Sequence, residues 1–297
     1  MSAILSPRLA IPLLMFLASV FAANHIAARL AFDHGASVAA AVAVRSGATA
    51  LAMLALLRLQ GIPMALPRST LARGFGIGLL VGVQSFCLYS AVAIIPVALA
   101  LLAFNTFPML FVLLTWVAGG DNPGRRAFVA MPLALLGLVL ALDILGTVEA
   151  MTGRWAEIGA GVGWALGASG SFALVLFLTT RHLKEVDGRM RTLLTMGATA
   201  VAVGGAGAIA GTLVLPADGT GWLGLLLLTV LYGSAITAMF TVVPRIGAAS
   251  NTAALNFEPI AALMLGWVIL GQSVAPRQIV GALIVVGAVI LIGTKRH

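Results

Sequence analysis

Charged side chains are scarce in this chain: Asp, Glu, Lys and Arg make up 9% of its 297 residues, whereas 61% of the residues are hydrophobic. So few polar groups cannot cover the surface of a water-soluble globule. The mean hydropathy of +1.11 indicates an integral membrane protein. Lipid cannot hydrogen-bond an exposed backbone, and the apolar runs here are long and continuous rather than alternating, so we predict an all-α membrane protein.

The motifs of several function classes are also missing. The chain has no Walker-type glycine loop, no His-Glu-x-x-His sequence and no paired acidic metal motif, which disfavours direct use of ATP and a membrane-embedded enzyme. We therefore expect no cofactor and no metal. Cys87 is the single cysteine and cannot form an internal disulfide. The basic residues are scattered, which disfavours nucleic-acid binding, and the loops are too short for a soluble binding module.

Apolar runs long enough to cross a bilayer occur ten times, at about 20 residues per span. The predicted spans are residues 10–31, 38–57, 72–92, 96–118, 127–146, 156–178, 193–214, 222–243, 248–270 and 276–293. With a cytoplasmic N-terminus, thirteen of the seventeen Lys and Arg residues fall inside and three fall outside. The positive-inside rule then places both termini in the cytoplasm. The excess of Arg over Lys suggests a bacterial source, so we expect a multi-pass protein of the bacterial inner membrane.

The two halves of the chain repeat one another at an offset of 151 residues. Ten identities fall in register across two spans and the turn between them, which predicts a duplication into residues 1–150 and 151–297. Each copy has an odd number of spans, so the second copy must enter the membrane from the opposite side. The matched residues are Ala103/Ala254, Asn105/Asn256, Pro108/Pro259, Leu114/Leu265, Trp116/Trp267, Val117/Val268, Gly120/Gly271, Arg126/Arg277, Val129/Val280 and Leu140/Leu291.

Polar side chains at membrane depth are few, and each is costly unless it is paired or hydrated. Glu258 lies about 12 Å from the start of its span, close to the midplane. Three roles fit it: a proton-coupling site, a counter-charge for a substrate ammonium group, or a neutral carboxyl that hydrogen-bonds across a helix interface. The polar candidates for substrate binding are Asn24, His25, Gln84, Tyr89, Asn105, Asn256 and Glu258.

The two repeated prolines interrupt their spans. Pro108 cannot bond the carbonyl of Phe104, nor Pro259 that of Leu255, so two acceptors are freed near mid-membrane. Such carbonyls hold cations in some transporters, although a neighbouring helix can equally heal the kink.

Arg45 also lies within a span, and we expect it to pair with Asp33 or to reach the outer surface, in preference to contacting a ligand. His25 suits a neutral hydrogen-bonding partner better than a proton relay. Glycines at every fourth position form two stripes, which predict close helix packing but could also line a cavity. The stripes are Gly74, Gly78 and Gly82 on the third span, and Gly159, Gly163 and Gly167 on the sixth.

The chain resembles the EamA-type branch of the drug/metabolite transporter superfamily. The resemblance covers almost the whole chain and is carried by Arg45 within Ala-Val-Arg-Ser-Gly, by Pro108 and the apolar run to Gly119-Gly120, and by Asn256-Phe257-Glu258-Pro259 followed by Leu270-Gly271-Gln272. Where that family usually has Gly-Glu, this sequence has Gly120-Asp121 and Gly271-Gln272.

The resemblance implies ten helices arranged as two inverted five-helix repeats around a central cavity, with the fifth and tenth helices peripheral. It implies export of amino acids, including aromatic ones, or of related metabolites by a monomer or homodimer in lipid. Efflux of cationic drugs and nucleotide-sugar exchange are the alternatives. Aromatic residues could line the cavity, although packing competes for them, and Trp164 joins the substrate-binding candidates on this ground; the others are Tyr89, Phe172 and Tyr232.

Overall fold

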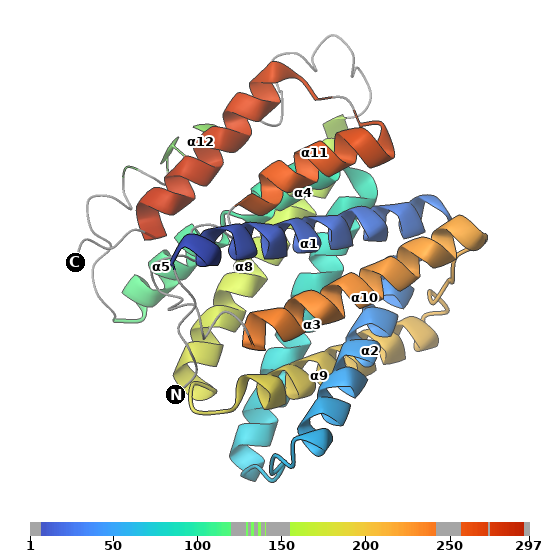
Figure 1. Cartoon of the computed structure of the whole chain (residues 1–297), viewed down its shortest axis with the longest axis vertical. Coiled ribbons are helices and arrows are strands. Elements are labelled where there is room, and N and C mark those ends of the chain that lie inside the picture. The colour runs from blue at the N-terminus through green and yellow to red at the C-terminus, as the bar shows by residue number, and fades with distance from the viewer. Residues whose placement is uncertain are drawn as a thin grey trace.

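The computed structural model describes residues 7–119, 129, 132–133, 136–137, 140, 155–241, 257–272 and 274–293. Within these residues every regular element is a helix and no strand occurs, as predicted (Figure 1). The helices are α1 (Pro7–Asp33), α2 (Val38–Leu59), α3 (Arg68–Ile94), α4 (Val97–Phe104), α5 (Phe107–Val117), α8 (Trp155–His182), α9 (Gly188–Ile209), α10 (Gly219–Thr241), α11 (Glu258–Leu270) and α12 (Pro276–Gly293).

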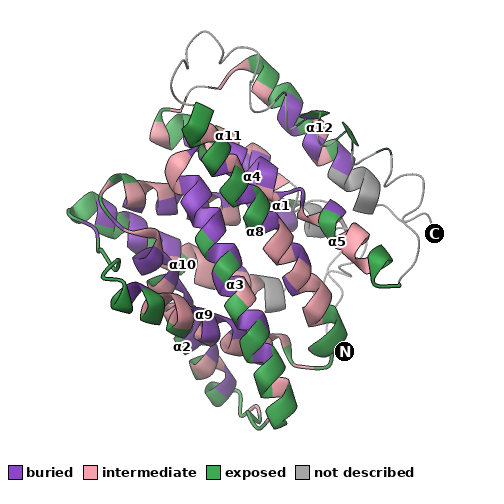
Figure 2. Ribbon diagram, turned by 180° about the vertical axis from the view of Figure 1, so that it is seen from behind, coloured by how far each residue is buried: buried purple, intermediate pink, exposed green. Residues whose placement is uncertain are grey.

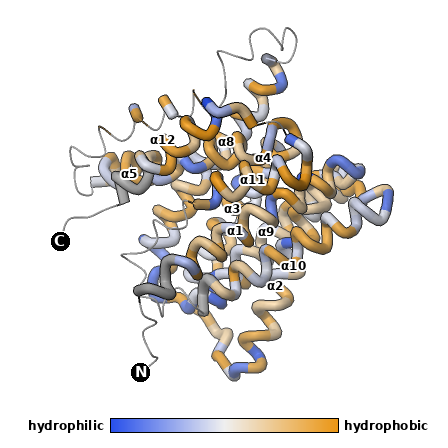
Figure 3. The backbone as a smooth tube through the Cα atoms, turned by 45° about the horizontal axis from the view of Figure 1, so that its top comes forward, coloured by the Kyte–Doolittle hydropathy of each residue, from blue (hydrophilic) through white to orange (hydrophobic). Residues whose placement is uncertain are grey.

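Seven helical stretches are long and apolar enough to cross a membrane: α1, α2, α3, the α4–α5 pair, α8, α9 and α10. Hydrophobic residues run along these helices, and hydrophilic ones gather toward the turns (Figure 3). Two shorter apolar helices, α11 and α12, fall within the ninth and tenth predicted spans. The fifth span and the first part of the ninth lie largely outside the described residues, so the count of ten helices stays a prediction.

Local sequence explains where several helices begin and end. The Ser37 hydroxyl accepts a hydrogen bond from the Ala40 N–H at 3.1 Å and caps α2. Pro96 separates α3 from α4, because the residue before it, Ile95, is extended. Gly271 ends α11 in the left-handed conformation, at φ +63°.

Asp187 caps α9 in the polar segment that joins the two halves. Its carboxylate accepts from the backbone N–H of Arg189 at 2.8 Å and from the Arg189 guanidinium at 2.7 Å. The hydrogen bonds from the Arg189 side chain are the main cause that lowers the pKa of Asp187 to about 2. Asp187 is therefore charged at neutral pH, at the helix end where negative charge is favourable.

The contacts between the two halves of the chain are reciprocal. The three most extensive pairs are α3 with α8, α2 with α9, and α1 with α10. Exchanging the halves in chain order turns the α1–α10 pair into the α8–α3 pair and maps the α2–α9 pair onto itself. Such reciprocity is what a two-fold relation between the halves requires.

The α2–α9 pair is antiparallel along its length. Gly207 lies against Ala39 and Gly204 against Ala43, with distances of 3.2 and 3.4 Å from an ideal Cβ on each glycine to the alanine Cβ. One turn further along α2, Gly47 meets Ala200 at 3.8 Å. Small residues at these positions let the two backbones approach closely.

Hydrogen bonds also join α2 to the second half at both of its ends. Before α2, the Ser37 N–H donates to the Val214 carbonyl at 2.9 Å, and His34 contacts Asp218 with Nδ1 to Oδ2 at 2.7 Å. Just after α2, the Arg189 guanidinium donates to Gln60. A helix of 22 residues separates these two sets of contacts.

The first glycine stripe packs as predicted. An ideal Cβ on Gly78 of α3 would lie 2.6 Å from Ala198 Cβ and 2.9 Å from the Thr195 carbonyl oxygen of α9. The prediction of close packing is wrong for the second stripe, because Gly159 and Gly163 of α8 meet no described atom within 4 Å of such a Cβ and Gly167 meets only Cys87 Sγ, at 3.9 Å. The packed face of α8 lies elsewhere on the helix and carries Gly161, Ala165 and Ala168.

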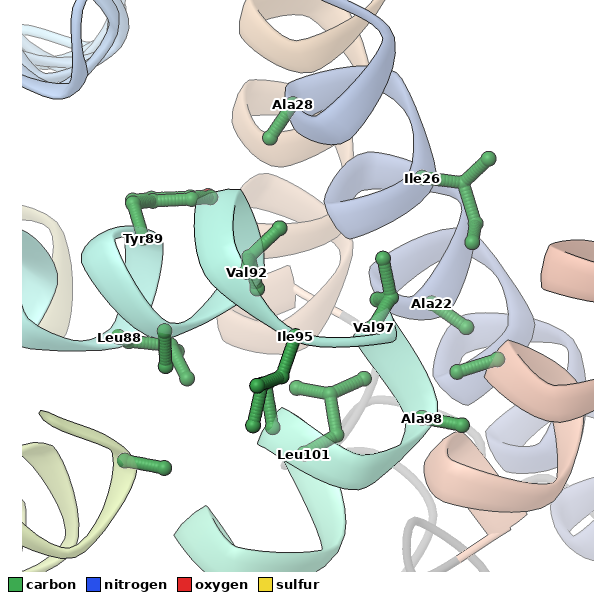
Figure 4. Packing of buried hydrophobic residues seen from close by; sticks show 14 of the residues in the cluster. Ala22, Ile26, Ala28, Leu88, Tyr89, Val92, Ile95, Val97, Ala98 and Leu101 are labelled. Carbon is green, nitrogen blue, oxygen red and sulfur yellow. The ribbon is translucent and has the colours of Figure 1, made fainter. Parts of the chain in front are cut away.

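The main hydrophobic core lies where α3 turns into α4 against α1. Figure 4 shows Val92, Ile95 and Val97 at this turn, opposite Ala22 and Ile26. Every residue of α4 from Val97 to Ala103 is buried, and exposed residues gather on the outer helices (Figure 2). Cys87 is a buried free thiol within this core. The core holds α1 and α3 together at the level of their polar residues.

Candidate functional site

Four polar side chains from three helices meet in the interior of the bundle. The Tyr89 hydroxyl of α3 accepts hydrogen bonds from Asn24 Nδ2 of α1 and from Arg45 Nη1 of α2, each at 3.2 Å. Arg45 Nη2 donates to the Ser85 hydroxyl at 3.0 Å, and Ser85 in turn donates to Gln84 Oε1 at 3.3 Å. All of these residues are buried. We call Asn24, Arg45, Ser85 and Tyr89 the polar cluster.

Our expectation for Arg45 was wrong. It neither pairs with Asp33 nor reaches the surface, since the residue is only 3% exposed. Asp33 instead pairs with Arg29, whose Nε lies 2.8 Å from Asp33 Oδ1, an interaction that i,i+4 spacing on one helix favours. Arg29 also donates to the last carbonyls of α3, Val92 and Ile95, at 3.0 and 3.3 Å.

Arg45 is held by two tyrosine rings as well as by hydroxyl groups. Its guanidinium carbon lies 3.9 Å from the ring centroid of Tyr232 on α10 and 5.1 Å from that of Tyr89. Both distances fall within the range of a cation–π interaction. A close contact between α1 and α10, at Gly224 against Ala27 and Ala31, brings α10 to this position.

Glu258 faces His25 across the interface of α1 and α11. His25 Nε2 lies 3.3 Å from Glu258 Oε1, and the imidazole lies 5.5 Å from the Tyr89 ring, centroid to centroid. Glu258 thus has a specific polar partner, which links it through His25 and Tyr89 to the polar cluster. Glu258 is the first residue of α11.

Several buried polar atoms around this site have no partner within the described residues. They are Asn24 Oδ1, His25 Nδ1, Arg45 Nε and Ser46 Oγ. Buried polar atoms are nearly always hydrogen-bonded in proteins, so each of these exceptions calls for an explanation. Their concentration on the neighbouring helices α1 and α2 fits a site that a polar ligand completes.

The other predicted site residues lie in different settings. Gln84 extends the polar cluster through Ser85, as described above. Asn105 is buried, but its Nδ2 donates to the Leu101 carbonyl of its own helix at 2.8 Å. Trp164 is 40% exposed on α8 and makes an edge contact with Phe86 at 6.2 Å. No described contact joins Asn105 or Trp164 to the polar cluster, and Asn256 lies outside the described residues.

The helix break before Pro108 is healed from within and by α8. Thr106 donates its hydroxyl to the Ala103 carbonyl at 2.8 Å, and its oxygen lies 2.9 Å from the Ser169 hydroxyl of α8. This geometry fits a break stabilised by a neighbouring helix better than a cation site at the carbonyl of Phe104. Leu255, the counterpart of Phe104, lies outside the described residues.

Three phenylalanine rings surround the break. Phe172 of α8 lies 5.4 Å from Phe104 and 4.8 Å from Phe107, centroid to centroid. Phe172 therefore packs against two rings, and its place in an aromatic lining of the substrate cavity stays a prediction. Aromatic groups pack favourably on such edge-on and tilted rings.

The chemistry available here is recognition by charge and hydrogen bonds. The Arg45 guanidinium contacts the Tyr89 ring, and Glu258 contacts His25, whose imidazole also lies against the Tyr89 ring. No group of three or more His, Cys, Asp or Glu side chains that could hold a metal ion occurs in the described part of the chain. Sequence reasoning found Asn24, His25, Tyr89 and Glu258 but missed Arg45 and Ser85 as members of this site.

Comparison with known proteins agrees with this architecture. The model of the EamA-like transporter family matches residues 8–142 and again residues 159–294, which is once in each half of the chain. One solved crystal structure matches with a TM-score of 0.60 over 98% of this chain and 98% of the other, at 17% sequence identity. At that identity the likeness concerns the fold alone.

Proposed function

Since the chain belongs to the EamA-like transporter family, with a match in both halves, it is a membrane transporter of small molecules, and we propose that it exports amino acids or related zwitterionic metabolites. The proposal places the substrate between the two halves of a ten-helix protein in the bacterial inner membrane. Transport would be secondary, without direct use of ATP, and would proceed by alternating access. The protein would act as a monomer or homodimer, without a cofactor.

The observation that carries the substrate assignment is the presence of an acidic side chain and of buried polar atoms without described partners inside an apolar bundle. An amino acid needs acceptors for its ammonium group and donors for its carboxylate, and each unmatched group is costly away from water. Glu258 and the free acceptor atoms of Asn24 and His25 suit the ammonium group. The hydroxyl and amide donors of Tyr89 and Gln84 suit the carboxylate, so both ends of a zwitterion find partners.

The inverted arrangement of the two copies is part of this proposal. It is supported by α2 and α9, which hold the same place in the two halves and run antiparallel in contact. It is supported as well by the starts of α5 and α11, at Phe107 and Glu258, which are 151 residues apart like the sequence repeat. Inverted repeats related by a two-fold axis in the membrane plane allow two states, one open to each side, in which the repeats exchange conformations.

Purified protein in liposomes loaded with labelled amino acids is expected to release them faster than protein-free liposomes do. Release should saturate and should compete with unlabelled amino acid, because a limited number of sites is involved. The same measurement with and without a pH gradient separates proton-coupled export from facilitated diffusion. Release of a cationic dye but of no amino acid would favour drug efflux and contradict the proposal.

The proposed orientation is tested by labelling with a membrane-impermeant maleimide. Glu185, before α9, and Leu215, before α10, are both exposed. We expect a Glu185→Cys protein to react only after cells are permeabilised and a Leu215→Cys protein to react in intact cells. Cys87 is buried and serves as the unreactive background. The opposite pattern would place both termini outside the cytoplasm.

A further inference from the structure

Within the part of the chain that the structure describes, Arg45 is a buried cation without an anionic partner. Its hydrogen-bonding partners are the hydroxyls of Tyr89 and Ser85, and its ring contacts are Tyr89 and Tyr232, all of them neutral groups. Within the described residues no carboxylate pairs with Arg45, and its Nε–H has no acceptor. Charged residues inside a membrane bundle are normally paired, so an unpaired one marks a functional site.

The position of Arg45 does not allow its charge to escape to water. The residue is the eighth of α2, so its backbone lies about 10 Å along the axis from the start of that helix. An arginine near a helix end can extend its head group to the interface. Here the guanidinium instead turns inward, between the rings of Tyr89 and Tyr232, and stays buried.

The neighbours of Arg45 add hydrogen-bond donors and no negative charge. The Tyr89 oxygen accepts from both Asn24 and Arg45, which uses its two lone pairs and leaves its own O–H to donate. A guanidinium has five N–H groups in a planar fork, and the described bonds use two of them. This surplus of donors beside a fixed positive charge matches the two oxygens of a carboxylate.

We propose that Arg45, with the Tyr89 hydroxyl, binds the carboxylate group of the transported substrate. Glu258 and His25, whose imidazole lies against the Tyr89 ring, receive the amine. The inference rests on the proposed function for the choice of an amino acid as ligand. The inference adds that a substrate must carry a carboxylate group, which distinguishes amino acids from cationic drugs that carry only an amine.

The proposal has a consequence for stability that does not depend on any ligand. Replacing Arg45 by Met keeps most of the side-chain length and removes the charge. Tyr89 would still accept from Asn24, and Ser85 would still donate to Gln84, so no hydroxyl loses its last partner. Apolar replacement of a buried charge is often neutral or stabilising, so the Tm of Arg45→Met should equal or exceed that of the wild-type protein.

Thermal unfolding of the full-length protein in detergent tests the site with three probes. They are L-phenylalanine, 3-phenylpropionate, which lacks the amine, and phenethylamine, which lacks the carboxylate. Both carboxylates should raise the Tm of the wild-type protein and leave that of Arg45→Met unchanged, with affinity for L-phenylalanine lowered about ten- to a hundredfold. Phenethylamine should act alike on both proteins. Arg58→Met, which removes an exposed arginine from the same helix, is the control.

The carboxylate site would be overturned if the two carboxylates raised the Tm of Arg45→Met as much as that of the wild-type protein. It would also be overturned if neither carboxylate raised the Tm of the wild-type protein. Should Arg45→Met not fold, Arg45→Lys is measured instead, because lysine keeps the positive charge but lacks the planar fork of N–H groups. If the carboxylates raise the Tm of Arg45→Lys as much as that of the wild-type protein, the proposal is also overturned. Efflux from liposomes separates the two hypotheses. No amino-acid efflux, with an Arg45-dependent response to 3-phenylpropionate, refutes the proposed function alone. Normal efflux through Arg45→Met refutes the carboxylate site alone.

Discussion

Glu258→Gln is expected to slow amino-acid export by about ten- to a hundredfold, while the protein still folds and inserts. The substitution keeps the shape of the side chain and removes its charge, and with it the partner proposed for the substrate ammonium group. Initial rates of efflux from liposomes measure the effect. Where transport is driven by a pH gradient, that dependence should disappear as well.

Glu185→Gln is the matched control for this change, since Glu185 is exposed in the polar segment before α9. It should transport at the wild-type rate. The alternative role of Glu258, as a neutral carboxyl bonded to His25 across the α1–α11 interface, gives a different result. If Glu258→Gln transports normally while Gln84→Ala or Asn256→Ala fails, Glu258 is structural and amides hold the substrate.

Gly78→Leu should prevent α3 and α9 from packing and should lower the stability by about 1–3 kcal/mol or more, the range for overpacked interiors. Even the first atom of the new side chain would lie 2.9 Å from the backbone oxygen of Thr195, which cannot move away alone. The helices would have to separate. The Gly78 carbonyl would then lose the hydrogen bond that it accepts from the Thr199 hydroxyl at 2.9 Å.

Gly76→Leu provides the comparison, because a Cβ on Gly76 meets no atom within 4 Å and the residue is exposed on the same helix. It should unfold at the wild-type temperature or above, since leucine favours the helix over glycine. Thermal unfolding and the fraction of monodisperse protein in detergent report both variants. Equal unfolding temperatures for Gly76→Leu and Gly78→Leu would refute the packing role of Gly78.

Helix positions could be predicted well because they depend on short-range properties. A continuous apolar run has to form backbone hydrogen bonds within itself, so the length of each run predicts a span. The break in the fourth span follows in the same way from Pro108, which cannot continue the helix that ends at Phe104. Neither inference required knowledge of which helix lies beside which.

Partners across helices could not be predicted with equal success. The spacing of four residues favours Arg29 as the partner of Asp33, but only the fold shows that Arg45 turns toward Tyr89 and Tyr232. The same limit explains the second glycine stripe. Spacing by four residues defines a face of α8, but the face that meets Ile95 of α3–α4 is the one with Gly161.

The candidate site shows where sequence reasoning is most informative. Intramembrane polarity alone was enough to select Asn24, His25, Tyr89 and Glu258, because the cost of burying such groups leaves few of them. It selected Asn105 by the same criterion, although that side chain bonds its own helix. Polarity therefore predicts that a residue has a partner, and the fold determines whether the partner is structural or a substrate.

The α2–α9 pair limits how the two halves can move. Beyond each end of α2, hydrogen bonds join the first half of the chain to the second. Between those ends, small residues let α2 and α9 pack closely. The pair is thus a seam that resists separation on either side of the membrane. We expect the two halves to rotate as rigid bodies about the α2–α9 contact, so that the substrate enters and leaves on the side of α4 and α11.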